Sequence, residues 1–127
     1  MRSSRYRRAL LLPIVVLQIL LVAAFLVGGL SKLAGAKPQL INFQRWRLPP
    51  AMRYVTGVVE LLGAGMMLLG IWTHGFAAWG GILLAGTMIG AMFVHFRVQD
   101  KFSQWFPAIV FLCVSLAVTI NYASYLF

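Results

Sequence analysis

Four long apolar stretches, separated by polar segments, organise the sequence. They lie at about residues 9–33, 51–72, 76–96 and 106–126, and the first is broken only by Gln18 between Ala9 and Leu30. Each is close to the roughly 20 residues that a helix needs to cross the hydrocarbon of a bilayer. A longer connection, a short turn at residues 73–75 and a second polar connection join them. The pattern predicts one all-α integral membrane domain over residues 1–127, a four-helix bundle with up-down-up-down topology.

The connection between the first two stretches, AGAKPQLINFQRWRLPP, mixes basic residues with aliphatic and aromatic ones. Basic segments that contain Trp commonly lie at headgroup depth, so a short interfacial helix or a re-entrant turn is predicted there. An ordinary solvated loop is the alternative. Pro49 and Pro50 are suited to begin the next helix. The first apolar run is too long for the core of a signal peptide, which favours an uncleaved first helix.

The composition excludes an ordinary soluble domain, since 61% of the 127 residues are hydrophobic and only 10% are charged, against about 25% in soluble proteins. Eleven Lys and Arg stand against two acidic residues, but no basic residue lies in 65–94 or 102–127. A nucleic-acid-binding face is therefore not predicted, and the charge is assigned to the membrane interface. The single Cys113 excludes a disulfide framework and is expected to be a small core residue.

One of the two acidic residues, Glu60, lies inside the second apolar stretch. A carboxylate in hydrocarbon usually faces the bundle interior, is paired, or is functional. In an antiparallel bundle Lys32, Arg53 and His95 fall near the same end, and Glu60 lies roughly 13 Å deeper than the start of its helix. The long basic side chains can reach it. A polar or ligand-binding cluster of these four residues is predicted, and the alternative is an ion pair that only fixes the helix register.

Small and polar residues on the apolar stretches predict contacts between helices. Gly57 and Gly63 flank Glu60 on one face, and the third stretch carries a G-x-x-x-G motif at Gly86 and Gly90, followed by Ala91. Gln18 and Asn121 fall at similar depth near the termini, and a structural hydrogen bond between them is predicted. His74 and His95 fall at opposite ends, so no metal site is predicted.

Four motifs occur in order along most of the chain: FLVGGLSKLAG at the end of the first stretch, F-x-x-W-x-L-P from Phe43, GVVELLGA from Gly57 and MIGAMFVH from Met88. With these motifs the chain resembles the DoxX and DoxX-like family of small four-helix bacterial membrane proteins. The positions of the family pattern in this chain are Gly29, Lys32, Pro49, Gly57, Glu60, Gly63, Ala91 and His95. Gly29 is thereby added as a predicted packing position. The resemblance implies this fold in the bacterial plasma (inner) membrane.

The resemblance also implies membrane redox chemistry, because the family takes its name from a subunit of quinol oxidase and thiosulfate:quinone oxidoreductase, and some relatives work in oxidative-stress or thiol-homeostasis complexes. The chain lacks bis-histidine haem sites, cysteine pairs and a flavin motif. An autonomous enzyme is therefore not predicted, and any redox role needs a partner subunit or a bound quinone.

Three functions follow as hypotheses. The first is an accessory subunit whose polar cluster faces a quinone or another small amphipathic ligand. The second is an assembly protein that docks on a membrane protein partner or forms a homo-oligomer. The third is a small transporter. The arginine-rich N-terminus favours cytoplasmic termini, although four basic residues on that side against seven on the other conflict with the positive-inside rule.

Overall fold

The computed structural model describes the backbone of residues 2–125 and the side chains of residues 12–125. The elements in chain order are α1 (Arg2–Ala34), α2 (Lys37–Arg45), α3 (Pro50–Leu69), α4 (His74–Arg97), α5 (Phe102–Asn121) and the 3₁₀ turn η1 (Ala123–Tyr125). The described residues contain no strand, so the all-α prediction is confirmed. The predicted end of the fourth span, at residue 126, lies outside the described residues.

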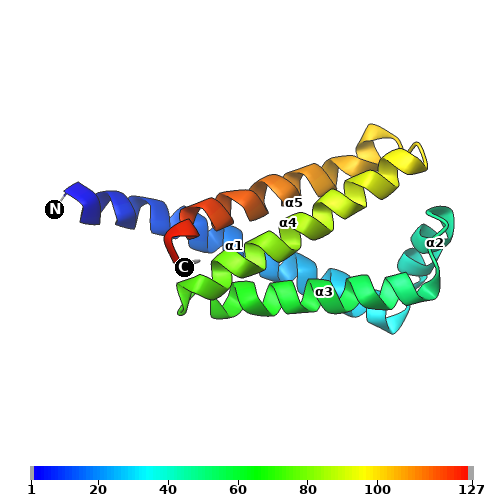
Figure 1. The fold of residues 1–127 in the computed structure, drawn as a ribbon, viewed down its shortest axis with the longest axis horizontal. Coiled ribbons are helices and arrows are strands. Elements are labelled where there is room, and N and C mark those ends of the chain that lie inside the picture. Colours follow the sequence, from blue (N-terminus) through cyan, green and yellow to red (C-terminus); the bar gives the residue numbers. More distant parts are fainter. Residues whose placement is uncertain (1, 126–127) are drawn as a thin grey trace.

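Four of the described helices are long and apolar enough to cross a membrane: residues Leu12–Ala34 of α1, and α3, α4 and α5. Their outward faces carry many exposed aliphatic and aromatic side chains. At 33 residues α1 is roughly 50 Å long, which exceeds the hydrocarbon thickness of about 30 Å. Figure 1 accordingly shows its N-terminal turns extending past the other helices. The chain is a multi-pass membrane protein.

The four long helices form a ring in which each contacts its neighbours. The most extensive contacts join α1 to α3, α3 to α4 and α4 to α5, and a smaller contact between α1 and α5 closes the ring. In Figure 1 the chain reverses direction between successive long helices, and α2 lies across the end where α1 leads into α3. The segment from residue 34 to residue 50 is therefore not an ordinary loop but contains a nine-residue helix.

Three helices end at this same side of the molecule in the same way. The residue after each helix cap, Gly35, Arg47 or Gln99, has a positive φ of 69°, 58° or 56°. The next amide then turns back to a carbonyl inside the helix, as in the bond from Ala36 to Ser31, which measures 3.0 Å. This is the Schellman motif, which satisfies carbonyls that a helix end leaves free. Glycine suits the first position, whereas the other two use polar residues in the left-handed region.

Small residues bring the helices together at several crossings. A Cβ at Gly29 would lie 2.9 Å from the carbonyl oxygen of Gly57, and one at Gly63 would lie 2.5 Å from a methyl group of Leu84. Ala91 is partly buried against the core. No described helix packs on the G-x-x-x-G motif, because Gly86 and Gly90 are exposed, and a Cβ at either position would meet no described atom within 4 Å, so the packing role of this motif stays a prediction. Apolar lipid tails can cover a small-residue face as well as a helix can.

The α3–α4 hairpin predicts a strong effect of side-chain bulk at Gly70. A Cβ there would lie 2.5 Å from the Cα of Ala77, and a backbone atom cannot move aside as a side chain can. We expect Gly70→Leu to lower the free energy of unfolding by about 1–3 kcal/mol or more. The matched control is Gly65→Leu, because nothing lies within 4 Å of a Cβ at Gly65. Thermal unfolding in detergent compares the two, and equal melting temperatures would contradict the hairpin packing.

The core near the termini contains a polar link between α1, α3 and the residue that caps α5. The hydroxyl of Tyr122 donates a hydrogen bond to Oε1 of Gln18 at 2.9 Å, and Nε2 of Gln18 faces the carbonyl oxygen of Met67 at 3.4 Å. The predicted bond between Gln18 and Asn121 is therefore wrong, since Asn121 is exposed. Adjacent residues of a helix point about 100° apart, so the neighbouring residue takes the inward position.

The single cysteine also differs from its prediction. Cys113 is exposed on α5 rather than buried in the core. In a membrane protein an apolar outer surface faces lipid, so a small weakly polar residue is accommodated there as readily as inside.

Candidate functional site

The buried ion pair joins α1 to α3. Nζ of Lys32 lies 3.0 Å from Oε1 and 3.2 Å from Oε2 of Glu60. The Lys32 side chain is 13% exposed and that of Glu60 is 5% exposed. Gly28 makes room for the carboxylate, since a Cβ there would lie 2.8 Å from Oε2 of Glu60. The pair lies inside the bundle, where each charge needs the other because burial removes most of the water around both.

Arg53 holds the end of α1 rather than joining the ion pair. Nη1 of Arg53 donates a hydrogen bond to the carbonyl oxygen of Lys32, in the last turn of that helix. Its guanidinium carbon lies 4.4 Å from the ring centroid of Tyr54. A cation at the C-terminal end of a helix is stabilised by the helix dipole and by the free carbonyls there. Arg53 therefore positions the backbone that carries Lys32.

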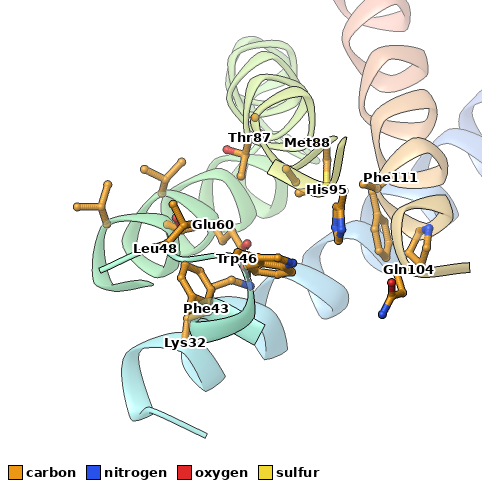
Figure 2. Close-up of a pocket in the computed structure, with 17 residues that line it drawn as sticks. Lys32, Phe43, Trp46, Leu48, Glu60, Thr87, Met88, His95, Gln104 and Phe111 are labelled. Atoms are coloured by element: carbon orange, nitrogen blue, oxygen red, sulfur yellow. Dashed lines mark hydrogen bonds and ion pairs between the residues drawn. The ribbon is translucent and has the colours of Figure 1, made fainter. Parts of the chain in front are cut away.

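A cavity of about 370 Å³ lies next to the ion pair, inside the ring of helices at the α2 end. This volume falls in the range of about 300–1,000 Å³ that is typical of small-molecule sites. All five helices contribute to its wall, as Figure 2 shows. The lining comprises Lys32, Phe43, Trp46, Leu48, Val55, Thr56, Val59, Glu60, Thr87, Met88, Gly90, Ala91, His95, Gln104, Pro107, Ala108 and Phe111.

The wall of this cavity is mostly apolar, with few polar groups left free. Both threonine hydroxyls are bonded within their own helices: Thr56 donates to the carbonyl oxygen of Met52 at 2.7 Å, and Thr87 to that of Leu83 at 2.9 Å. Such back-bonded threonines have no hydroxyl hydrogen left for another acceptor. The Lys32–Glu60 pair, His95 and the Gln104 amide are therefore the main polar features that a molecule in the cavity would meet.

His95 is held by Asp100, which lies in the connection between α4 and α5. Nδ1 of His95 lies 2.5 Å from Oδ2 of Asp100. The Schellman turn at the end of α4 brings the two together, because the amide of Asp100 donates to the carbonyl oxygen of His95 at 2.9 Å. A proton on Nδ1 fits this contact, which leaves Nε2 as the ring nitrogen for other partners.

Asp100 also ties α2 to the α4–α5 connection. It accepts hydrogen bonds from Nη1 of Arg45 and, at 3.2 Å, from Nε1 of Trp46. Arg97 adds a hydrogen bond to the carbonyl oxygen of Trp46. We call this set, Arg45, Trp46, His95, Arg97 and Asp100, the Asp100 clasp. It holds α2 across the end of the cavity.

The surroundings of Asp100 favour its ionised form. Burial of the carboxyl opposes ionisation, but the hydrogen bonds from His95 and Trp46 and the charge of Arg45 outweigh it. The pKa of Asp100 therefore lies below its usual value. At neutral pH the clasp has a carboxylate at its centre.

The structure brings three of the four predicted cluster residues to one cavity. Lys32, Glu60 and His95 line it, whereas Arg53 does not. Asp100 and Trp46 were not among the predicted site residues. One signal could have identified Asp100, namely that it is the second of only two acidic residues and follows His95 by five positions. His74 lies at the other end, stacked on Tyr122 with ring centroids 5.1 Å apart.

Comparison with known proteins agrees with the motifs that surround this cavity. The sequence model of the DoxX-like family matches residues 16–118. The chain belongs to the DoxX-like family. The matched region of this DoxX-like protein contains every residue that lines the cavity and the whole Asp100 clasp.

A relative of this DoxX-like protein is an uncharacterized protein, YdgD, of Bacillus subtilis (strain 168). The two sequences are 29% identical over 105 residues, which cover 82% of this chain and 92% of YdgD. No solved structure matches the chain.

Proposed function

We propose that this DoxX-like protein is an accessory subunit of the bacterial plasma membrane that binds a small amphipathic molecule, a quinone in the first place, in the cavity under α2. The observation that carries the proposal is the chemistry of the cavity wall. The Lys32–Glu60 pair and His95 line a pocket whose wall is mostly apolar and which lies inside the helix ring. Sites for small molecules combine such an apolar wall with a few polar groups that fix orientation.

A quinone suits this combination of groups. Its ring fills an apolar space, and its carbonyl oxygens accept hydrogen bonds, which the Lys32 ammonium and a protonated His95 can donate. Reduction of a quinone to the quinol takes up two electrons and two protons. Glu60, His95 and Lys32 are groups that can exchange protons, while the electrons must come from a partner subunit that carries a redox cofactor.

The polar wall predicts loss of quinone binding when the ion pair is replaced as a whole. We expect the double variant Lys32→Met/Glu60→Met to remain folded, because replacing both charges leaves no unpaired one. It should bind a short-chain ubiquinone analogue about tenfold more weakly, which corresponds to about 1.4 kcal/mol, the scale of one hydrogen bond. Titration in nanodiscs with native mass spectrometry measures bound quinone.

Thr56→Val is the matched control for this experiment. It alters the same cavity wall, but the hydroxyl that it removes is bonded to the backbone of its own helix. Quinone affinity should therefore stay near the wild-type value. Wild-type protein that binds no quinone, or a double variant that binds it as well as Thr56→Val does, would refute the proposal.

A role in assembly is the second candidate, and one observation favours it. Gly86 is exposed on the membrane-spanning part of α4, with open space where a side chain would be. A helix of another membrane protein, or of a second copy, could approach closely there. Native mass spectrometry of protein from its own membrane distinguishes the two candidates, because assembly predicts a specific bound subunit that Gly86→Leu displaces without change in quinone content.

A further inference from the structure

α2 covers the cavity at one end, and exposed cavity-lining residues lie on two other sides: Val55 and Gly90 between α3 and α4, and Gln104 and Pro107 on α5. At the surface end, α2 lies across it, and the Asp100 clasp fastens the end of α2 to the α4–α5 connection. Phe43 is 5% exposed and packs edge to face on Trp46, whose ring packs in the same way on His95. A cover made of packed aromatic rings and charge-assisted hydrogen bonds resists entry from this end.

The wall between α3 and α4 is built differently. Near the short turn the two helices pack closely, where a Cβ on Gly63 or Gly80 would meet the opposite helix within 3.2 Å. Towards α2 the helices diverge, as Figure 1 shows, and the cavity lies between Val55 and Val59 on one side and Gly90 and Ala91 on the other. We call this part of the wall the α3–α4 window.

The α3–α4 window connects the cavity with the outer face of the protein. Val55 lines the cavity and is nevertheless 55% exposed, and Gly90 lines it and is exposed too. A Cβ at Gly90 would have no described atom within 4 Å. Because Gly90 has no side chain, no group from α4 fills the window at this position.

The chemistry of the window is that of hydrocarbon. Its residues are valine, alanine and glycine, and the two flanking threonines, Thr56 and Thr87, bond their hydroxyls to their own helices. The window lies within the membrane-spanning segments of α3 and α4. Transfer of an alkyl chain into such a passage leaves no polar group unpaired, whereas a charged or strongly hydrated molecule would lose its water there.

We propose that the cavity receives its ligand sideways from the bilayer through the α3–α4 window, and that this ligand carries a hydrocarbon chain which lies in the window while its polar head meets Lys32, Glu60 and His95. The inference rests on the proposed function, because it assigns the ligand class of the same cavity. It narrows that class to lipid-soluble molecules with a chain and makes Gly90 a residue that determines access.

The test asks whether hydrocarbon reaches the cavity, and it needs no quinone. Trp72, Trp79 and Trp105 are replaced by Phe, so that Trp46, in the cavity wall, is the single tryptophan and can be excited selectively. The full chain is reconstituted in phosphatidylcholine vesicles whose acyl chains carry bromine at mid-chain depth. Trp46 caps α2 and lines the cavity, so hydrocarbon that enters through the window brings bromine close to its ring. We expect strong quenching of Trp46, and loss of most of it in Gly90→Leu, whose side chain fills the opening.

Gly65→Leu is the matched control, because it adds the same side chain to a membrane-spanning glycine with open space outside the cavity wall. It should keep the quenching of the parent protein. Val55→Phe narrows the window from α3 and should act like Gly90→Leu, so the test does not depend on the folding of one variant. Equal quenching in Gly90→Leu and Gly65→Leu would overturn the inference. Weak mid-chain quenching together with strong quenching by aqueous acrylamide would also overturn it, since the ligand path would then lead to the surface.

The outcome is separable from that of the proposed function. Mid-chain quenching that depends on Gly90, in a protein that binds no quinone, refutes the quinone and leaves a cavity for another chain-bearing lipid. Quinone binding that Gly90→Leu does not weaken, with unchanged quenching, retains the proposed function and refutes access through the window.

Discussion

Lys32→Met and Glu60→Gln are each expected to lower the free energy of unfolding by about 3–5 kcal/mol, because each leaves one partner of a buried ion pair without its counter-charge. The two groups are 3.0 Å apart and are nearly enclosed by protein. Lipid offers the remaining charge no water. No described ion pair gives Lys32 or Glu60 a second partner. Unfolding in nanodiscs or mixed micelles measures the change.

The double variant Lys32→Met/Glu60→Met decides what the pair contributes. Its stability should return to within about 1 kcal/mol of wild type or exceed it, since apolar groups of similar volume can replace a buried pair without loss. The two single effects would then be far from additive, as expected for residues in direct contact. Additive losses would contradict the pairing. Lys37→Met serves as control, because Lys37 is an exposed lysine on α2.

Much of the fold could be predicted from the sequence, because the length of an apolar run is itself a membrane constraint. The four spanning segments and the amphipathic segment between the first two follow from that reasoning, and the family match supports the same architecture. The face that each helix presents to its neighbours could not be derived in the same way. Gly57 and Gly63 lie at helix crossings whereas Gly86 and Gly90 do not, although all four belong to small-residue patterns in apolar helices. In lipid both faces are apolar, so periodicity does not separate them.

Some contacts of the candidate site could be derived from the sequence, and others could not. Lys32 and Glu60 could be placed together because antiparallel threading fixes their depth and the lysine stem is long enough to span the difference. Asp100 could not be placed beside His95 from the sequence, because this contact depends on a Schellman turn with Gln99 in the left-handed region. That conformation is uncommon for glutamine, and the sequence around it carries no glycine to indicate it.

The Asp100 clasp predicts that α2 becomes mobile when the carboxylate is lost. Asp100 accepts from Arg45, Trp46 and His95 at once, so Asp100→Ala removes three charge-assisted or polar contacts and leaves Trp46 and His95 unpartnered there. We expect Asp100→Ala to lower the free energy of unfolding at the α2 end by about 1.5–3 kcal/mol, the scale of a hydrogen bond to a charged group. The effect should be confined to one end, because the helix crossings at Gly63 and Gly70 do not involve it.

Hydrogen–deuterium exchange locates this effect and its pH dependence. Asp100→Ala should raise the exchange of α2 amides strongly, while α3 and α4 near their common turn keep their protection. The control variant Lys101→Gln, at an exposed neighbouring residue, should change the exchange of neither region.

Because the pKa of Asp100 is lower in the folded protein than usual, the clasp is fully present above the ordinary aspartate pKa of about 3.9 and weakens as pH falls through the lower, folded value. Wild-type α2 should thus exchange like that of Asp100→Ala only in strong acid. Protection of α2 that is equal in Asp100→Ala and Lys101→Gln would show that other contacts hold α2 over the cavity.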